Sequence, residues 1–531
     1  MTALTTAADT GAEEYAAAAQ AMRAKLRELD EVNEQLAAAG GEKAVERHRK
    51  RGKLTARERI ELLVDRDAPF LELCPYAAWG SDFPVGASVV GGIGVVSGVE
   101  CMIVANDPTI AGGTTNPRTL KKQLRLKDIA MENRLPMISL VESGGANLPT
   151  QSEVFIPGGA TFRHLAEMSK AGIPTISIVF GNSTAGGAYQ PGMSDHVVMI
   201  EQQSKVFLGG PPLVKAATGE VSDDESLGGA EMHARTSGLA DHLARDEQDA
   251  LRIGRRIVAR LNHRKEGPAP GPVAAPLHSG EELLGIVPED LRIPFDPREV
   301  LARVVDGSDF DEFKPLYGSG MVTGWARIHG YPVGIVANSK GVIFSEEAQK
   351  VTQFIQIANR QRTPLLFLHN TTGYMVGRKY EEGGIIKHGS MMVNAVSTST
   401  VPHISLLIGA SYGAGHYGMC GRDYNPRFLF AWPSAKSAVM GGAQLADVVT
   451  SVAKASAEAR GLPFDDEKNE LRRAAIEKQI EAESLPLFLS GMVYDDGIID
   501  PRDTRTVLGL SLSAIATGPV ESDRSYGIFR M

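Results

Sequence analysis

The chain has 531 residues, of which 43% are hydrophobic, enough for two or three well-packed domains. Its 64 acidic and 55 basic residues give a formal charge of −9 without a long basic block, which argues against DNA or RNA as a partner. Three widely spaced cysteines, Cys74, Cys101 and Cys420, exclude a zinc ribbon or a disulfide framework and fit reduced thiols in a cytoplasm.

The first predicted elements are helices within residues 14–64. An alanine-rich helical segment ends at the glycine pair Gly40–Gly41, and Thr55 with Glu58 predicts a capping box at the start of a further helix. The first residues include acids and lack an apolar core, unlike a signal or transit peptide, and no apolar run reaches membrane-spanning length. We therefore expect an N-terminal helical extension on a cytoplasmic protein.

A stretch rich in proline and glycine, residues 266–277, has the composition of a linker. It divides the chain near its middle. The predicted domains are residues 1–265, which include the helical extension, and residues 278–531.

The two halves resemble each other at a single offset of 228 residues. Residues 172–189 match residues 400–417 at seven of eighteen positions, and residues 129–145 match residues 357–373 at the same offset. Each copy alternates apolar runs, typical of buried strands, with helical stretches. We therefore predict a tandem duplication and an α/β fold.

In each copy a buried strand runs into a loop of small residues. A helix that starts there leaves backbone N–H groups free, and such groups can hold a developing oxyanion. Gly186 and Gly187 occupy this place in the first copy, and Ala414 and Gly415 occupy it in the second. The alternative, that the glycines only allow a helix to pack closely on the strand, stays open.

Two motifs in the second loop point to other chemistry and are weak. "GAGHYG" at 413–418 has the glycine spacing of a dinucleotide site but lacks the acidic residue expected about twenty positions later. "GASYG" at 409–413 has the spacing of a nucleophile elbow around Ser411, but the only later histidine is His416, five residues on. We therefore interpret Ser411 as a turn residue and His416 as a structural or substrate-contact residue. No metal-ligand spacing occurs, so no metal is expected.

Six long motifs carry a resemblance: "RGKLTARERIELLVD", "ESGGANLPTQ", "STAGGAYQPGMSD", "VFLGGPPLVKAATGE", "ASYGAGHYGMCGR" and "VMGGAQLA". They resemble the motifs of the carboxyltransferase β subunits of biotin-dependent acyl-CoA carboxylases. The resemblance covers residues 20–515, and "SGGANLP" and "GPPLVKAATGE" are most similar to the methylcrotonyl-CoA and geranyl-CoA branch. Propionyl- and acetyl-CoA enzymes usually read "SYGGAYDVM" where this chain reads "SYGAGHYGM".

The resemblance implies two crotonase-like domains, the first on the acyl-CoA side and the second on the biotin side. It also implies a homohexameric core (β6) with active sites between the first domain of one subunit and the second domain of another. The partner would be an α subunit that carries biotin carboxylase and biotin carrier activities, in an α6β6 complex. This chain has no M-K-M biotinylation site and no glycine-rich ATP loop, as expected of a β subunit.

By the same resemblance, the amides of Gly186 and Gly187 would hold the thioester oxygen of the acyl-CoA, and those of Ala414 and Gly415 the ureido oxygen of biotin. Biotin freed of its carboxylate can take the substrate proton, so no side-chain base is required. For the CoA phosphates the candidates are cations that could equally be solvated surface residues. The predicted substrate-binding residues are Ala185, Tyr189, Gly144, Gly145, Gly413, His416, Arg51, Lys53 and Lys215.

The predicted function is transfer of a carboxyl group from carboxybiotin to an acyl-CoA, with 3-methylcrotonyl-CoA or a related branched or unsaturated acyl-CoA as the expected substrate. One alternative is the β subunit of a propionyl-CoA or acetyl-CoA carboxylase. An alternative of another class is a non-catalytic scaffold of the crotonase fold that binds CoA esters.

Overall fold

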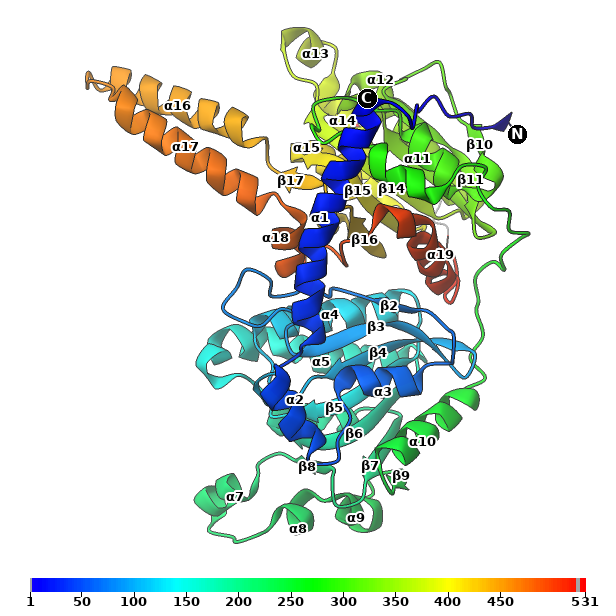
Figure 1. The fold of residues 1–531 in the computed structure, drawn as a ribbon, viewed down its shortest axis with the longest axis vertical. Helices are drawn as coiled ribbons and strands as arrows, with labels where there is room; N and C mark the ends of the chain where they lie inside the picture. Colours follow the sequence, from blue (N-terminus) through cyan, green and yellow to red (C-terminus); the bar gives the residue numbers. More distant parts are fainter. Residues whose placement is uncertain (1, 522–525) are drawn as a thin grey trace.

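A computed structural model describes residues 2–521 and 526–531, whose strands form two mixed sheets, one of eight strands and one of nine (Figure 1). The first sheet contains β2 (Phe70–Glu72), β3 (Val89–Val96), β4 (Val99–Asn106), β5 (Met137–Ser143), β6 (Thr175–Thr184), β7 (His196–Ile200), β8 (Lys205–Phe207) and β9 (His242–Ala244). The second contains β1 (Thr2–Ala3), β10 (Asp309–Glu312), β11 (Met321–Ile328), β12 (Tyr331–Asn338), β13 (Gly341–Ile343), β14 (Leu365–Tyr374), β15 (His403–Tyr412), β16 (Phe428–Ala431) and β17 (Lys436–Ala438).

Helices pack on both sheets and connect the parallel strands. Those of the first half are α1 (Glu13–Ala37), α2 (Glu42–Arg49), α3 (Ala56–Leu63), α4 (Pro117–Glu132), α5 (Gln151–Lys170), α6 (Tyr189–Gly192), α7 (Pro211–Thr218), α8 (Asp224–Gly228), α9 (Ala230–Met232) and α10 (Glu247–Ala259). Those of the second half are α11 (Pro297–Val304), α12 (Ser345–Gln361), α13 (Arg378–Glu382), α14 (Ile385–Thr398), α15 (Gly413–Gly418), α16 (Gly442–Ala459), α17 (Asp466–Glu483), α18 (Pro486–Gly491) and α19 (Thr504–Ile515).

The two sheets repeat one topology. In the first, the antiparallel pair β3–β4 leads into parallel β5, β6 and β7, with β8 added to the end of β6. In the second, β11–β12 leads into parallel β14, β15 and β16, with β17 added to the end of β15. Every residue of β5 is buried, as expected of a parallel strand covered on both faces. The predicted α/β fold and its duplication are confirmed.

The 228-residue offset also holds in fine backbone detail. The β5–β6 register shifts between Val141 and Ser143, and the β14–β15 register shifts between His369 and Thr371. Ala185 and Gly413, one offset apart, both take left-handed backbone angles, with φ of 55° and 53°. The two loops that follow β6 and β15 therefore leave their sheets in the same way.

The helical extension forms as predicted, and its beginning contacts the second half. Thr55 and Glu58 make the capping box at α3, with Glu58 N donating to Thr55 Oγ1 at 3.3 Å. β1 pairs with β10, and the Tyr15 hydroxyl of α1 donates to the Glu282 carbonyl at 3.1 Å. Figure 1 shows α1 running along both halves. The domain bounds at 265 and 278 remain a prediction.

A buried ion cluster joins the two halves. Asp496 is fully buried, and its two carboxylate oxygens each accept from Arg125 of α4 at 2.8 Å. Arg422 and the Leu429 amide also donate to Asp496 at 2.8 Å. These cationic neighbours hold the pKa of Asp496 below its ordinary value although burial opposes them. A charged, buried carboxylate is thus one of the contacts that join the two halves.

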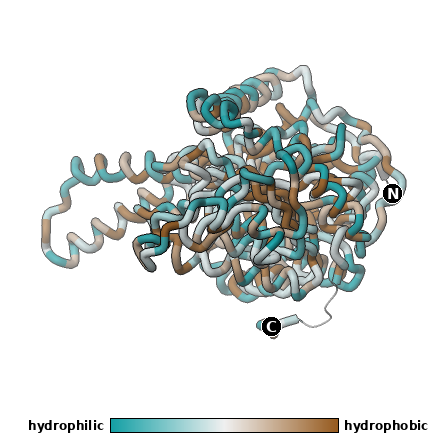
Figure 2. The backbone as a smooth tube through the Cα atoms, turned by 90° about the horizontal axis from the view of Figure 1, so that it is seen from below, coloured by the Kyte–Doolittle hydropathy of each residue, from teal (hydrophilic) through white to brown (hydrophobic). Residues whose placement is uncertain are grey.

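Helices α16 and α17 project from the body as a hairpin (Figures 1 and 2). They pack mainly on each other, and Arg473 ties them together through Asp447 at 3.0 Å. The hairpin carries three apolar side chains that are at least half exposed, Val448, Val452 and Leu471. No helix within the described residues combines the length and the apolar character needed to cross a bilayer.

Candidate active site

The first predicted loop begins where β6 ends. Ala185 turns the chain with φ of 55°, a conformation that residues with a Cβ rarely adopt, and a short 3-10 turn, Ala185–Ala188, follows. The first N–H groups of such a turn have no acceptor within it. Ala185 and Gly186 are exposed and Gly187 is half-buried, so the loop lies at the protein surface.

The end of β5 lies directly beside this loop. Ser143 pairs with Ser183 across the two parallel strands, and the Ser143 hydroxyl accepts from the Gly145 amide at 3.1 Å. Ser183 Oγ donates to the Gly187 carbonyl at 2.8 Å and so fixes the loop. The predicted residue Gly145 therefore lies beside the start of this loop, where a Cβ built on it would be 3.4 Å from the Thr184 carbonyl oxygen.

The two loops differ in why they contain glycine. A Cβ built on Gly187 would meet only Ser183 Oγ, at 3.6 Å, and one on Gly186 only the Phe162 ring, at 3.5 Å, both ordinary contacts. A Cβ on Gly415 would lie 2.9 Å from the Thr371 side chain. Close packing thus accounts for the glycine at 415 but not for Gly186 and Gly187. The space in front of these two glycines is open to a bound ligand.

The second loop follows β15 in the same geometry. Gly413 starts α15 with φ of 53°, Ala414 is exposed, and Gly415 is buried. Tyr189 and Tyr417, one offset apart, stand beside the two loops at 48% and 47% exposure. Both loops therefore pair free helix-start amides with a half-exposed tyrosine.

Ser411 is not the turn residue that the sequence indicated. It lies within β15 and is fully buried, and its Oγ is 2.9 Å from His369 Nδ1 and 2.8 Å from His416 Nδ1. The strand continues past Ile408 because β17 pairs with residues 410–412. The sequence pattern missed His369 because it lies 42 residues before Ser411 and reaches it only across the sheet. Because this hydroxyl is buried, a substrate cannot reach it. Burial therefore argues against Ser411 as a nucleophile more strongly than the position of the later histidine does.

Three of the predicted binding residues meet in one pocket. Arg51, Lys53 and Gly144 line a cavity of about 340 Å³ together with Arg47 and Glu142. Arg47 and Arg51 are exposed, whereas the Lys53 ammonium forms an ion pair with Glu142 and donates to the Phe180 carbonyl at 3.1 Å. The third predicted cation, Lys215, is exposed on α7 and is not among the described residues that line this pocket.

A buried charge network anchors the extension to this pocket. Arg59 of α3 is fully buried and pairs with Glu142 at the end of β5 and with Glu247 of α10, both at 2.8 Å. Its guanidinium also lies 4.2 Å from the centre of the Phe180 ring. Sequence analysis missed these partners because 83 to 188 residues separate them from Arg59. The motif "RGKLTARER" is therefore held at the strand ends that form the site.

The second loop borders two cavities that share Ala414. One, of about 360 Å³, is lined by His416, Tyr417 and Asp495 among others. The other, of about 560 Å³, is mostly apolar and lies against α14. Burial lowers the pKa of His416 to about 4, so this ring is neutral at physiological pH.

Asp495 gives a prediction on the pH dependence of stability. Burial raises its pKa from 3.8 to about 7, although Ser490 Oγ donates to it at 2.5 Å. A raised carboxyl pKa stabilises the fold below pH 3.8, and this contribution is lost as pH rises to about 7. We expect the free energy of unfolding to fall by about 1.4 kcal/mol per pH unit in this window relative to Asp495→Asn. Denaturant titrations at several pH values measure the difference, and parallel pH profiles would contradict it.

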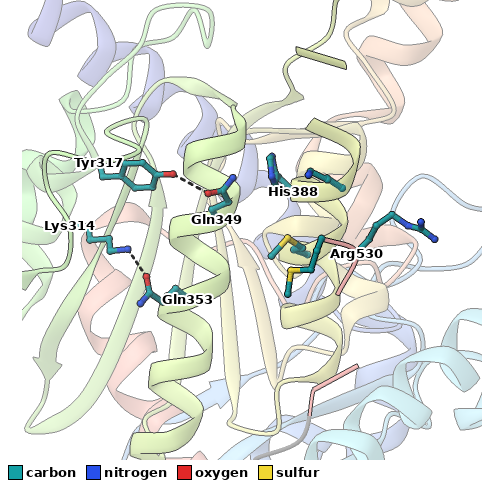
Figure 3. Close-up of a pocket in the computed structure, with 9 residues that line it drawn as sticks. Lys314, Tyr317, Gln349, Gln353, His388 and Arg530 are labelled. Atoms are coloured by element: carbon teal, nitrogen blue, oxygen red, sulfur yellow. Dashed lines mark hydrogen bonds between the residues drawn. The ribbon is translucent and has the colours of Figure 1, made fainter. Parts of the chain in front are cut away.

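A further pocket, of about 520 Å³, lies between α12 and α14 and contains none of the predicted site residues (Figure 3). Lys314 donates to Gln353 at 2.5 Å and Tyr317 to Gln349 at 3.1 Å, so both polar groups are turned toward α12. Arg530 extends away from them. The cations of this pocket do not converge on one point.

Comparison with known proteins decides the family. Residues 47–526 match the family model described as "Carboxyl transferase domain". The chain belongs to this family. A Mycobacterium tuberculosis protein named "Probable biotin-dependent acyl-coenzyme A carboxylase beta2 subunit" is 73% identical over 98% of this chain and 99% of its own length. The "Biotin-dependent 3-methylcrotonyl-coenzyme A carboxylase beta1 subunit" of the same organism is 51% identical over 95% of this chain and 97% of its own length.

A solved structure of the carboxyl transferase family supports the same assignment. The β subunit of Pseudomonas aeruginosa geranyl-CoA carboxylase superposes with a TM-score of 0.90 at 42% identity, covering 99% of each chain. The predicted family, the fold class and the assignment as an enzyme, the carboxyltransferase β subunit of a biotin-dependent acyl-CoA carboxylase, are confirmed. The roles of individual site residues stay predictions.

Proposed function

We propose that this carboxyltransferase adds a carboxyl group to a branched or unsaturated acyl-CoA, with 3-methylcrotonyl-CoA as the preferred substrate. The single observation that carries the choice is the 51% identity, over 95% of this chain, to a relative named for that substrate. The likeness to a geranyl-CoA carboxylase subunit points to the same chemical class, an acyl chain with a branch and a double bond.

In the proposed mechanism the first loop holds the thioester. The amides of Gly186 and Gly187 donate to the thioester oxygen, where negative charge develops as the γ carbon of the 3-methylcrotonyl group, which is conjugated to the thioester, loses its proton. The absence of a Cβ on both residues keeps the oxygen close to the N–H groups. Arg47 and Arg51 of the neighbouring pocket supply positive charge for the CoA phosphates, while Lys53 remains paired with Glu142.

The second loop serves the carboxyl donor. Carboxybiotin, delivered by a partner subunit, would supply the carboxyl group as its C–N bond breaks, and the freed nitrogen would accept the proton lost by the γ carbon of the substrate. A new C–C bond forms at that carbon, so atoms and charge balance. In this proposal Ala414, which is exposed and lines both cavities, donates its amide to the ureido oxygen, and the close packing of Gly415 on Thr371 supports the loop behind it.

We also propose an assembly for the complete enzyme. The names of the relatives as β subunits of biotin-dependent carboxylases support a partner α subunit. That this partner carries biotin carboxylase and biotin carrier activities rests on the resemblance of the sequence. The homohexameric core, the α6β6 stoichiometry and a cytoplasmic location rest on the resemblance and composition of the sequence alone.

A substrate panel run in the reverse direction tests the proposal without the α subunit. The full chain is incubated with free biotin and the carboxylated product of 3-methylcrotonyl-, geranyl-, propionyl- or acetyl-CoA, and carboxybiotin formation is measured. We expect the highest kcat/KM with the 3-methylcrotonyl-CoA product. Preference for the propionyl or acetyl product would support the first alternative. Binding of CoA esters without transfer from any of them would contradict the proposed substrate class.

A further inference from the structure

A buried hydrogen-bond chain in the second half has no counterpart in the first. His369 Nδ1 and His416 Nδ1 lie 2.9 Å and 2.8 Å from the single hydroxyl of Ser411. The residues 228 positions before the two histidines are Val141 and Ala188, both buried and apolar. The duplicated fold therefore does not itself require polar groups at these two places.

The serine that both halves share bonds differently in each. In the first half Ser183 Oγ donates directly to the backbone carbonyl of Gly187 at 2.8 Å. In the second half the equivalent hydroxyl of Ser411 bonds the side chain of His416, which belongs to α15. The bond that fixes the loop to its strand is thus made by a backbone group in one copy and by an imidazole in the other.

The His416 ring is held in one orientation. A Cβ on Gly421 would overlap the ring, and the Gly421 amide donates to the His416 carbonyl at 2.9 Å. His369 and His416 stand edge to face with ring centres 5.7 Å apart. Because Ser411 has only one proton to donate, its hydroxyl cannot donate to both rings, so at least one of the two histidines carries its proton on Nδ1 and donates to Ser411.

The hydrogen-bonded series His369–Ser411–His416 ends beside the groups assigned to the carboxyl donor. His416 and Ala414 line the same cavity, two residues apart on α15, and Ser437 of that cavity donates to the Ser411 carbonyl at 3.0 Å. Burial lowers the pKa of both histidines, so neither carries a charge that would break the bonds at neutral pH. A shift of His416 would move the start of α15 and with it the Ala414 amide.

We propose that His416, tied to His369 through Ser411, is a positioning residue that sets the second loop for the carboxyl donor and has no equivalent role on the acyl-CoA side. The inference rests on the proposed function, because it assigns the second loop to biotin. It predicts that a substitution that breaks the His416–Ser411 hydrogen bond lowers kcat/KM for biotin and leaves KM for the CoA ester nearly unchanged.

Two substitutions at His416 separate the hydrogen bond from the ring. His416→Phe keeps the ring that packs on Gly421 but removes Nδ1, whereas His416→Asn keeps a polar atom at the δ position and loses the ring. The full chain and both variants are assayed for carboxyl transfer from the carboxylated acyl-CoA to free biotin. The Michaelis constants for both substrates and the thermal midpoints are measured.

We expect His416→Phe to lower kcat/KM for free biotin at least tenfold while KM for the CoA ester changes less than twofold. His416→Asn should recover most of the loss. Two results would overturn the inference and leave the proposed function intact. One is an unchanged kcat/KM for biotin in His416→Phe. The other is an equal loss of kcat/KM for biotin and for the CoA ester that His416→Asn does not recover. An inactive wild-type chain would overturn the proposed function and the inference with it.

Discussion

Replacing Gly187 with valine is expected to lower carboxyl transfer by about 100- to 1,000-fold while the protein stays folded. The loss corresponds to about 2.7–4 kcal/mol, the effect of removing one donor from an oxyanion site. The fold should tolerate the change because a Cβ on Gly187 meets only Ser183 Oγ, at 3.6 Å. The branched side chain would instead fill the space in front of the amides. Transfer to free biotin measures the activity. Size-exclusion chromatography and thermal unfolding show whether the protein stays folded.

Gly192 provides the matched control for this variant. It lies five residues further along the same segment, is exposed, and a Cβ there would meet nothing within 4 Å. We expect Gly192→Val to keep activity within a few-fold of the wild type. Near-normal turnover in a folded Gly187→Val protein would show that the first loop does not hold the reacting oxygen.

Replacing Asp496 with asparagine is expected to lower the free energy of unfolding by about 3–5 kcal/mol, since breaking a buried ion pair leaves the partner charge uncompensated. Asparagine keeps the shape of the side chain, but the Arg125 guanidinium loses its carboxylate between the halves. The lowered pKa of Asp496 means that its contribution is present above the ordinary aspartate pKa and is lost as pH falls below it. Chemical denaturation at neutral pH measures the change.

Asp290→Asn is the control for this prediction. Asp290 is paired with Arg292 at 2.7 Å, but the pair is local and largely exposed. Exposed pairs contribute little to stability because water and salt screen their charges. Equal, small effects of the two substitutions would show that the Asp496 cluster does not hold the halves together.

The sequence predicted the features that depend on local pattern and on repetition. Apolar runs after Pro136, Pro174, Pro364 and Pro402 became the central parallel strands, because a run buried on both faces is apolar throughout. A common offset located both loops, because duplicated segments keep their backbone conformation, down to the left-handed angles at Ala185 and Gly413.

Features that depend on tertiary contacts could not be predicted in this way. Ser411 looked like a turn residue because small residues surround it, but pairing with β17 extends its strand. Lys53 looked like a free cation, and its carboxylate partner, Glu142, lies 89 residues away. Arg125 and Asp496 are 371 residues apart, so only the packing of the two halves brings them together.

The most direct test of the account is carboxyl transfer by the full chain alone. The carboxylated product of 3-methylcrotonyl-CoA is labelled at its carboxyl carbon, and transfer of the label to free biotin is measured as carboxybiotin. The account predicts transfer that requires both substrates and falls at least about 100-fold in Gly187→Val. A folded wild-type chain that moves no label from any carboxylated acyl-CoA, or a Gly187→Val protein that moves it at the wild-type rate, would contradict it.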